Sequence, residues 1–506
     1  MFASLRANVH EHRGTVDIWT DIFGLEPVFA YRDSTRVILS TSIEEMGRIR
    51  STEHTRPDPI GFIAALMSDA ALGTQMSIRR TALEGVELLP VERATRVTLG
   101  DIDVSVQSAL EGTEKQLEAL GPDDYPQLLA SGVEEVVENV GAVLQDGRFA
   151  RQVINVTGGK DSRLLVAAAM ATGRASDFEA MTNGSRDSDD VRLGSAVARY
   201  AGIDYASEPL GRVHLSDRAA VFKEWTEWSL GSYHEVQLPA GAVDDSDAPV
   251  LRLIGGCGEL YRGFHQSRYP QNILETVPPS SEVILSAFHD VIDRDIVKPD
   301  VLRQYRAELD DWIGESLDQS LSRQLDRHYL EFRNRLHIGA SGQFNARYMP
   351  QTVNPLASTH LYMASRVIGA RDREKARVVH DVLYSLDPML AAFEFDGRGD
   401  QWNAEWLDGV RASLPDGRDA WSRASQRRAA AELDMRSDQS APASPTLVYE
   451  AEVSNAAAAL HDMADLPFSV EKAVGMADWY RSQERVRMHS IWASRLSAAA
   501  RLWVST

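Results

Sequence analysis

The order of hydrophobic and polar positions predicts a first region that is rich in strands. Residues 14–105 contain short apolar and β-branched runs that are separated by turns. Such runs are typical of strands, because alternate side chains of a strand face a core. The clearest runs are 28–31, 37–42 and 95–99. We therefore expect a β-rich structure in this part of the chain.

The next part of the chain predicts helices and then a parallel sheet. Apolar residues recur at helical spacing over 106–148, and strand-like and helix-like segments alternate from Val153 onward. This alternation is typical of α/β folds, in which helices connect parallel strands. The second helix of this pattern begins with the acidic cluster 187–190. A metal site is one interpretation of the cluster, but an N-cap at Ser188 or Asp187 explains it more simply.

The last third of the chain is expected to be mostly helical. Residues 299–336 carry apolar side chains near helical spacing. Residues 437–446 are polar and proline-rich, which is typical of a linker. Alanine-rich helical patterns follow, so we expect a helical C-terminal tail over 447–506.

Composition limits the class of protein. The 506 residues exceed one comfortable core and predict two or three domains, and 43% hydrophobic content is ordinary for a globular chain. A net charge of −21 argues against nucleic acid as a partner, and no apolar run is long enough to predict a membrane partner. The single cysteine, Cys257, cannot form an internal disulfide, and the N-terminus lacks a signal-like apolar segment. A cytoplasmic protein is expected.

Residues 153–165 carry the most informative motif, V-I-N-V-T-G-G-K-D-S-R-L-L. The pattern predicts a strand, a tight glycine turn and the start of a helix. Glycines let the backbone approach a phosphate, and a helix N-terminus offers N–H groups and the positive end of its dipole. Asp161 would repel a phosphate, so its place is explained if Mg²⁺ bridges carboxylate and phosphate oxygens. The alternative is an ordinary strand-to-helix turn that Asp161 or Ser162 caps.

This motif resembles the S-G-G-x-D-S pyrophosphate loop of ATP pyrophosphatases, with Thr157 in place of the first serine. Residues 14–42 resemble the hairpins of the amidotransferase domain in asparagine synthetases, and 81–90 resemble that family's segment ending G-I-x-x-L-P-P-G. Residues 254–264, I-G-G-C-G-E-L-Y-R-G-F, resemble its G-E-G-A-D-E-L-F-G-G-Y loop. The four landmarks follow the order of the asparagine synthetase-like family, which includes β-lactam synthetases and lasso-peptide cyclases.

The resemblance implies a fold and a domain order. The fold would be α/β, with a parallel-sheet ATP-pyrophosphatase synthetase domain at 106–436. A truncated and inactive Ntn amidotransferase-like β-rich domain would precede it at 1–105. The linker at 437–446 and the helical tail at 447–506 would follow.

The resemblance also implies an activity. Such enzymes use ATP and Mg²⁺ to convert a carboxylate into an acyl-adenylate, release pyrophosphate, and let an amine displace AMP to form an amide. The expected partners are a small-molecule or peptide carboxylate and an amine, and a lasso-type cyclase would add a precursor peptide or a protease partner. Glutaminase activity is not expected, because the chain begins at Met1 without the family's nucleophilic cysteine.

Several positions would form the site if the resemblance holds. The backbone of the strand that ends at Met181 would recognise adenine, and Asp161 and Glu259 would bind the metal. For Glu259 the alternative is an acidic residue at a helix start. The expected ATP-binding residues are Val156, Thr157, Gly158, Gly159, Asp161, Ser162, Met181, Gly255 and Gly256. The expected catalytic residues are Asp161, Lys160, Glu259 and Arg398. Arg163 is a further candidate charge partner of the phosphates.

The chain also departs from the family pattern. Gly255 stands where the family has an acid, Gly258 replaces its aspartate, and the usual R-x-K is not evident. Arg398 is the nearest cationic substitute, and Lys375 is a second candidate that an exposed helical charge run explains better. Two alternatives therefore stay open: a small-molecule amide ligase or β-lactam-type synthetase, and a pseudo-synthetase that binds nucleotide without turnover.

Overall fold

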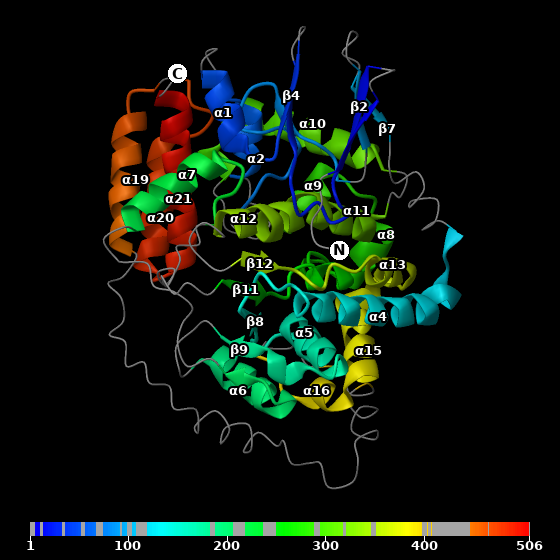
Figure 1. The fold of residues 1–506 in the computed structure, drawn as a ribbon. Helices are drawn as coiled ribbons and strands as arrows, with labels where there is room; N and C mark the ends of the chain where they lie inside the picture. Colours follow the sequence, from blue (N-terminus) through cyan, green and yellow to red (C-terminus); the bar gives the residue numbers. More distant parts are fainter. Residues whose placement is uncertain are drawn as a thin grey trace.

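The computed structural model describes these parts of the chain: 6–10, 14–32, 36–51, 56–66, 74–91, 94–98, 104–107, 119–182, 188–205, 218–235, 249–287, 294–316, 320–345, 351–396, 402, 406, 446–463 and 465–504. The structure is mixed α/β (Figure 1). The expected linker at 437–446, apart from the first residue of a helix, and the expected site residue Arg398 lie outside the described residues.

A five-stranded parallel sheet forms the centre of one half of the molecule. In spatial order its strands are β10 (Asp204–Tyr205), β9 (Glu179–Met181), β8 (Arg151–Asn155), β11 (Val250–Leu253) and β12 (Gln351–Val353). Every neighbouring pair is parallel, and Leu253 of β11 lies beside both Ile154 and Val353. The parallel sheet that the alternating pattern predicts is thus confirmed.

Helices cover this sheet and share one hydrophobic core with it. α5 (Lys160–Ala171) packs against β8 and α6 (Asp189–Ala201) against β9 and β10; the helices that pack beside them are α4 (Tyr125–Val143), α13 (Thr359–Val367), α15 (Arg377–Leu386) and α16 (Pro388–Ala392). The short α14 (Ala370–Glu374) leads into α15. The predicted cap of α6 is confirmed, because the Ser188 hydroxyl accepts a hydrogen bond from the Val191 N–H. Gly202 ends the helix in the left-handed region, at φ 69°.

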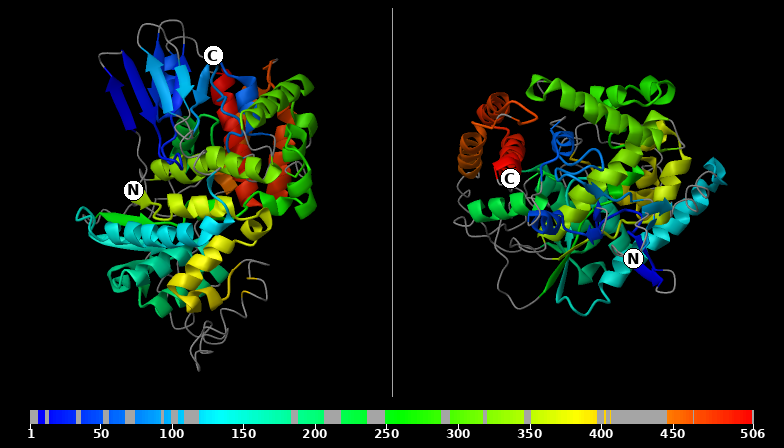
Figure 2. Two further views of the ribbon diagram at one scale, coloured as in Figure 1. Left: turned by 90° about the vertical axis from the view of Figure 1, so that its right-hand side faces the viewer. Right: turned by 90° about the horizontal axis from the view of Figure 1, so that it is seen from above.

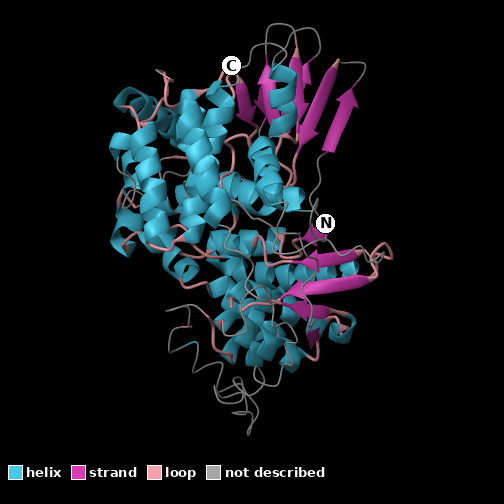
Figure 3. Cartoon of the chain, turned by 90° about the vertical axis from the view of Figure 1, so that its left-hand side faces the viewer, coloured by secondary structure: helices cyan, strands magenta, loops and turns pink. Residues whose placement is uncertain are grey.

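The N-terminal region contains two antiparallel sheets, as its pattern of short runs predicts. One sheet orders β1 (Arg6–His10), β2 (Thr15–Trp19), β6 (Ala94–Thr98) and β7 (Val104–Gln107), and the other orders β4 (Val37–Ser40), β3 (Phe29–Arg32) and β5 (Val86–Leu88). Two short helices, α1 (Ile43–Ser51) and α2 (Pro59–Ala64), follow β4. Figures 2 and 3 show these strands at one end of the molecule, away from the parallel sheet.

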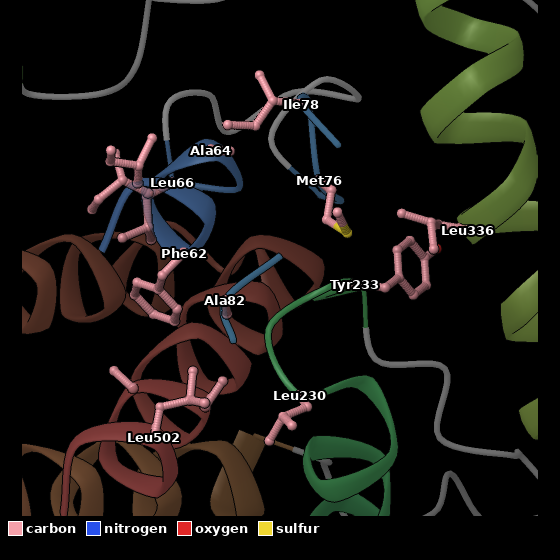
Figure 4. Packing of buried hydrophobic residues seen from close by; sticks show 14 of the residues in the cluster. Phe62, Ala64, Leu66, Met76, Ile78, Ala82, Leu230, Tyr233, Leu336 and Leu502 are labelled. Carbon is pink, nitrogen blue, oxygen red and sulfur yellow. The ribbon is translucent and has the colours of Figure 1, made fainter. Parts of the chain in front are cut away.

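A second hydrophobic core joins segments that are far apart in the sequence. Its longer helices are α7 (Arg218–Ser229), α10 (Pro299–Gly314), α11 (Leu321–His328), the π-helix Tyr329–Ala340, α19 (Thr446–Leu460), α20 (Val470–Ser482) and α21 (Val486–Val504). Its shorter helices are α8 (Gln271–Thr276), α9 (Ser281–Ser286) and α12 (Ser341–Asn345). Figure 4 shows three members of this cluster from distant segments: Phe62 of α2, Leu230, which directly follows α7, and Leu502 of α21.

The observed packing crosses the expected domain boundaries. Side chains from 29–88 share the second core with α7, α10 and the C-terminal helices, so neither residue 105 nor residue 436 separates two independent cores. The tail is helical, as predicted, but it is built into this core instead of being a separate appendage.

Two predicted helical regions contain breaks. The region 299–336 is divided between α10, α11 and the start of the π-helix, and a new helix begins after Ser320. In the region 106–148, the described residues begin in strand β7 before α4. No helix in the described part of the chain is long and apolar enough to cross a membrane.

Candidate functional site

The predicted motif lies at the carboxyl edge of the parallel sheet, between two central strands. After β8 the chain continues to β9 and β10 on one side, and after β11 it continues to β12 on the other side. The loops that leave β8 and β11 therefore diverge, and sheets of this kind bind ligands outside the carboxyl ends of two such strands. The two loops at this point are 156–159 and 254–258.

Side chains within the motif hold the turn between β8 and α5. The Ser162 hydroxyl accepts a hydrogen bond of 3.1 Å from the Thr157 N–H and lies 3.1 Å from the Thr157 carbonyl oxygen. The Gly159 N–H donates to the Thr157 hydroxyl at 3.2 Å. Within the described residues no side chain caps α5, whose N-cap is Gly159. The start of α5 thus has the N–H groups and dipole end that favour an anion.

Asp161 lies in the first turn of α5 and packs against the loop after β11. A methyl group on Gly258 would come within 2.7 Å of Asp161 Cγ, and one on Gly255 would come within 2.9 Å of Asp161 Cβ. Larger residues at these two positions would displace the carboxylate. The structure therefore brings together two residues that the sequence assigned to the site, Asp161 and Gly255, from segments almost a hundred residues apart.

The Asp161 carboxylate has two different oxygen environments. Its Oδ2 accepts a hydrogen bond of 2.9 Å from Nη2 of Arg262. Its Oδ1 is buried and has no hydrogen-bond partner among the described residues. Burial raises the pKa of Asp161, and the positive charge of Arg262 opposes this shift. An unpartnered buried carboxylate oxygen is costly, and a ligand that binds to it removes that cost.

Glu259 is the second carboxylate of this site. It lies in the 3₁₀-helix Gly258–Tyr261, where Oε1 is 3.6 Å from Arg262 Nη2 and Oε2 accepts a hydrogen bond from the Tyr329 hydroxyl. Burial, followed by the negative charge of Glu259, raises the pKa of Tyr329 well above its ordinary value, so this phenol stays protonated and donates. The structure thus places the two expected metal ligands around one guanidinium.

Asn354 and Ile338 pack against Gly256 of the β11 loop. A methyl group on Gly256 would lie 2.0 Å from Asn354 Oδ1 and 2.5 Å from Ile338 Cγ2. Cys257, at φ 71°, is buried, and this burial raises its thiol pKa. The thiol is therefore a small buried group, as expected, and a poor nucleophile.

Other predicted residues lie near the loop in different roles. The Lys160 ammonium lies 5.4 Å from the ring centroids of Phe395 and Trp402. The Arg163 guanidinium is buried and donates to backbone carbonyls, including those of Phe393 at 2.9 Å and Gly158 at 3.1 Å. Arg163 therefore anchors the chain that follows α16, so its expected role as a phosphate partner is not what the structure shows.

The remaining predictions concern the edges of the site. The Met181 carbonyl accepts a hydrogen bond of 2.8 Å from the Val156 N–H, which aligns the end of β9 with the motif. Lys375 is exposed at the end of α14, in agreement with its interpretation as a surface charge.

Three residues near the motif were not assigned to the site from sequence. Asp190 of α6 accepts a hydrogen bond of 3.0 Å from the Gly158 N–H through Oδ1, although a helix cap was the favoured interpretation of its acidic cluster. Tyr329 belongs to a distant π-helix, and nothing in its local sequence points to the site. For Arg262 the sequence did hold a signal, because an arginine stands where the family loop that 254–264 resemble has a glycine.

The carboxylates fit a magnesium ion that is shared with phosphates. The described residues contain no group of three or more His, Cys, Asp or Glu that could hold a metal ion, so an ion at Asp161 and Glu259 would take its other ligands from water or phosphate. Magnesium usually takes one or two carboxylates and completes its shell with phosphate oxygens and water. Asp161, whose Oδ1 has no hydrogen-bond partner among the described residues, and Glu259 could supply these carboxylates.

No protein-family model matches the chain, and no curated protein matches it. The resemblance to asparagine synthetase-like enzymes accordingly rests on the four sequence landmarks.

Proposed function

We propose that this protein is an ATP- and Mg²⁺-dependent ligase that forms an amide bond through an acyl-adenylate. Its parallel-sheet half would be of the ATP-pyrophosphatase type. The observation that carries the proposal is the Asp161 carboxylate with its buried Oδ1, held between the β8–α5 turn and the β11 loop where these strands diverge. A glycine turn, a helix start and this carboxylate are the parts that a magnesium–polyphosphate complex requires.

Each part of the site would have a defined task. The turn 157–159 and the start of α5 would bind phosphate oxygens, and Asp161 and Glu259 would hold Mg²⁺, which would neutralise charge on the triphosphate. A substrate carboxylate oxygen would then bond to the α-phosphorus while the bond to pyrophosphate breaks. An amine would next attack the acyl carbon, lose a proton and release AMP. Hydroxide is a poor leaving group from a carboxylate, and adenylation replaces it with a good one.

The contacts of Asp161 favour a ligand role over a cap. A capping carboxylate accepts hydrogen bonds from N–H groups of the first helical turn. Within the described residues, Asp161 instead accepts from Arg262 through Oδ2 and leaves Oδ1 without a partner. A capping hydrogen bond to α5 therefore does not explain the position of this carboxylate.

A second function has support from one observation. Gly255 and Gly258 replace the two other acids of the family loop, and the Asp161 side chain occupies the space beside them. A site with fewer carboxylates fits a pseudo-synthetase that binds nucleotide without turnover. The retained Asp161 and its glycine turn favour the ligase.

Nucleotide binding and product analysis test the proposal together. Calorimetry with α,β-methylene-ATP should show binding that depends on Mg²⁺, and absence of binding would exclude both functions. Phosphorus NMR with ATP and a panel of carboxylates should detect AMP and pyrophosphate, and labelled pyrophosphate should exchange into ATP only with the right carboxylate. ADP with orthophosphate would contradict the mechanism. Binding without any turnover across the panel would favour the pseudo-synthetase.

A further inference from the structure

Arg262 connects the two carboxylates of the site. Its Nη2 is 2.9 Å from Asp161 Oδ2 and 3.6 Å from Glu259 Oε1. The side chains of Arg262, Asp161 and Glu259 are 24%, 18% and 23% exposed, so the cluster is mostly buried with an opening to solvent. A guanidinium in this position neutralises one of the two negative charges.

The local backbone directs this side chain into the site. The 3₁₀-helix Gly258–Tyr261 ends at Arg262, whose backbone is extended with φ −134° and whose N–H donates to the Glu259 carbonyl at 3.4 Å. Glu259 and Arg262 are three residues apart and lie on one side of this turn. The family loop that 254–264 resemble has glycine at this position, so the guanidinium has no counterpart in that motif.

We propose that Arg262 is a resident counter-ion of the Asp161–Glu259 pair, and that a divalent cation displaces its guanidinium when it binds. This inference rests on the proposed function, because it concerns the same two carboxylates. A metal ion and a guanidinium on the same carboxylates repel each other, and only one of them satisfies the metal's need for close oxygen contacts. Arg262 is tethered beside solvent and is the group that moves away. Cation binding therefore includes the cost of breaking the Arg262–Asp161 contact.

This cost predicts a gain of metal affinity when the arginine is removed. Hydrogen bonds to charged groups contribute enough that losing this competitor should tighten metal binding by about tenfold. Arg262→Gln removes the charge and keeps a polar side chain of similar reach. Arg262→Lys keeps the charge on a single ammonium, so its affinity should fall between those of the wild type and Arg262→Gln. If Arg262 only supported the fold, its loss would loosen the site and weaken metal binding.

The experiment titrates the full chain with Mn²⁺ in the absence of nucleotide and follows the electron paramagnetic resonance signal of the free ion. Arg268→Gln, which removes a positive charge from an exposed site six residues away, is the matched control and should bind Mn²⁺ as the wild type does. Tighter binding by Arg262→Gln, with Arg262→Lys in between, supports the proposal. Equal or weaker binding by Arg262→Gln at an unchanged melting temperature overturns it.

The Arg262→Lys variant keeps the test decisive if Arg262→Gln does not fold. Arg262→Lys alone must then bind Mn²⁺ more tightly than the wild type, and equal or weaker binding overturns the inference. Failure of the proposed function is recognised separately, because it appears as absence of ATP-analogue binding or of AMP formation in the wild type.

Discussion

The carboxylate of Asp190 accepts a hydrogen bond of 3.0 Å from the backbone N–H of Gly158, the central glycine of the β8–α5 turn. In the proposed function this N–H faces a phosphate oxygen. The Asp190 carboxylate therefore lies where that phosphate oxygen would bind. A phosphate must compete with Asp190 for this donor and also meets its negative charge. If the turn binds phosphate as proposed, this contact would lower its affinity for phosphate.

Asp190→Asn should strengthen the binding of inorganic pyrophosphate, because it removes the charge and weakens the hydrogen bond to Gly158. The expected gain is about fivefold to tenfold, measured by calorimetry without metal at low ionic strength. Asp189→Asn is the matched control, since Asp189 is exposed on the same helical turn and pairs with Arg192 at 3.1 Å. Equal effects of the two substitutions would show that the Gly158 N–H is not part of an anion site.

Gly258→Ala should damage the site with only a moderate loss of stability. The added methyl group would lie 2.7 Å from Asp161 Cγ, so the carboxylate must move away from its place beside Glu259. We expect about 1–3 kcal/mol of destabilisation from overpacking and at least tenfold weaker binding of the magnesium–nucleotide complex. Urea unfolding and calorimetry with α,β-methylene-ATP measure the two effects.

Gly475→Ala is the control for that substitution. Gly475 is in α20, and a methyl group there would meet no atom within 4 Å among the described residues. Alanine should stabilise this helix by about 0.5–1 kcal/mol and leave nucleotide affinity unchanged. Unchanged nucleotide binding by Gly258→Ala would contradict the placement of Asp161 in the site.

The local sequence pattern predicted those elements that are determined by residues close together in the sequence. The strand, turn and helix of 153–165 were predictable because a β-branched run, two glycines and a helical period all occur within thirteen residues. The cap of α6 at Ser188 was predictable for the same reason. In each case the deciding interactions join residues close in sequence.

The roles of other residues depend on contacts between segments that are distant in sequence, and the local pattern does not show these contacts. Arg163 resembles a phosphate ligand in the motif, but the carbonyls of the chain near Phe393 surround it in the fold. Asp190 resembles a simple cap until β8 and α6 are brought together. The C-terminal helices resemble an appendage, because partners in the core such as Phe62, which packs against Trp503, lie hundreds of residues earlier in the chain.

Glu331 should contribute strongly to stability at neutral pH. Burial by itself raises its pKa, but the positive charges of Arg79 and Arg327 outweigh this effect and lower the pKa from 4.5 to about 2. The Trp312 indole N–H also donates to Glu331 Oε2 at 3.0 Å. Because the folded-state pKa is depressed, the stabilisation is complete above about pH 4.5 and is lost as the pH falls toward 2.

Glu331→Gln should therefore lower the free energy of unfolding by about 3 kcal/mol at pH 7, and this difference should shrink steadily below pH 4.5. Urea unfolding of both proteins between pH 7 and pH 3 checks the trend. Glu315→Gln is the control, because Glu315 is exposed although it also pairs with Arg79, at 2.7 Å, and should change stability by less than about 1 kcal/mol. A difference that grows toward acid would contradict the assignment of an ionised buried Glu331.

Asp161→Asn should separate catalysis from stability. Asparagine keeps the size of the side chain, loses the ion pair with Arg262, and removes the cost of burying a carboxylate charge. These two effects on stability oppose each other, so the melting temperature should change little. Loss of the metal anchor should lower AMP release by about a hundredfold or more, as for the loss of one preorganised electrostatic contact.

The measurement compares melting temperature and AMP release under saturating ATP and Mg²⁺ for the wild type, Asp161→Asn and Asp177→Asn. Asp177 is an exposed carboxylate shortly after α5 that pairs with Arg174 at 2.8 Å, so its substitution should change neither quantity. If Asp161 only capped α5, asparagine would replace it without effect, because both residues are good caps. An unaltered rate in Asp161→Asn would thus assign the motif a purely architectural role and favour the pseudo-synthetase over the ligase.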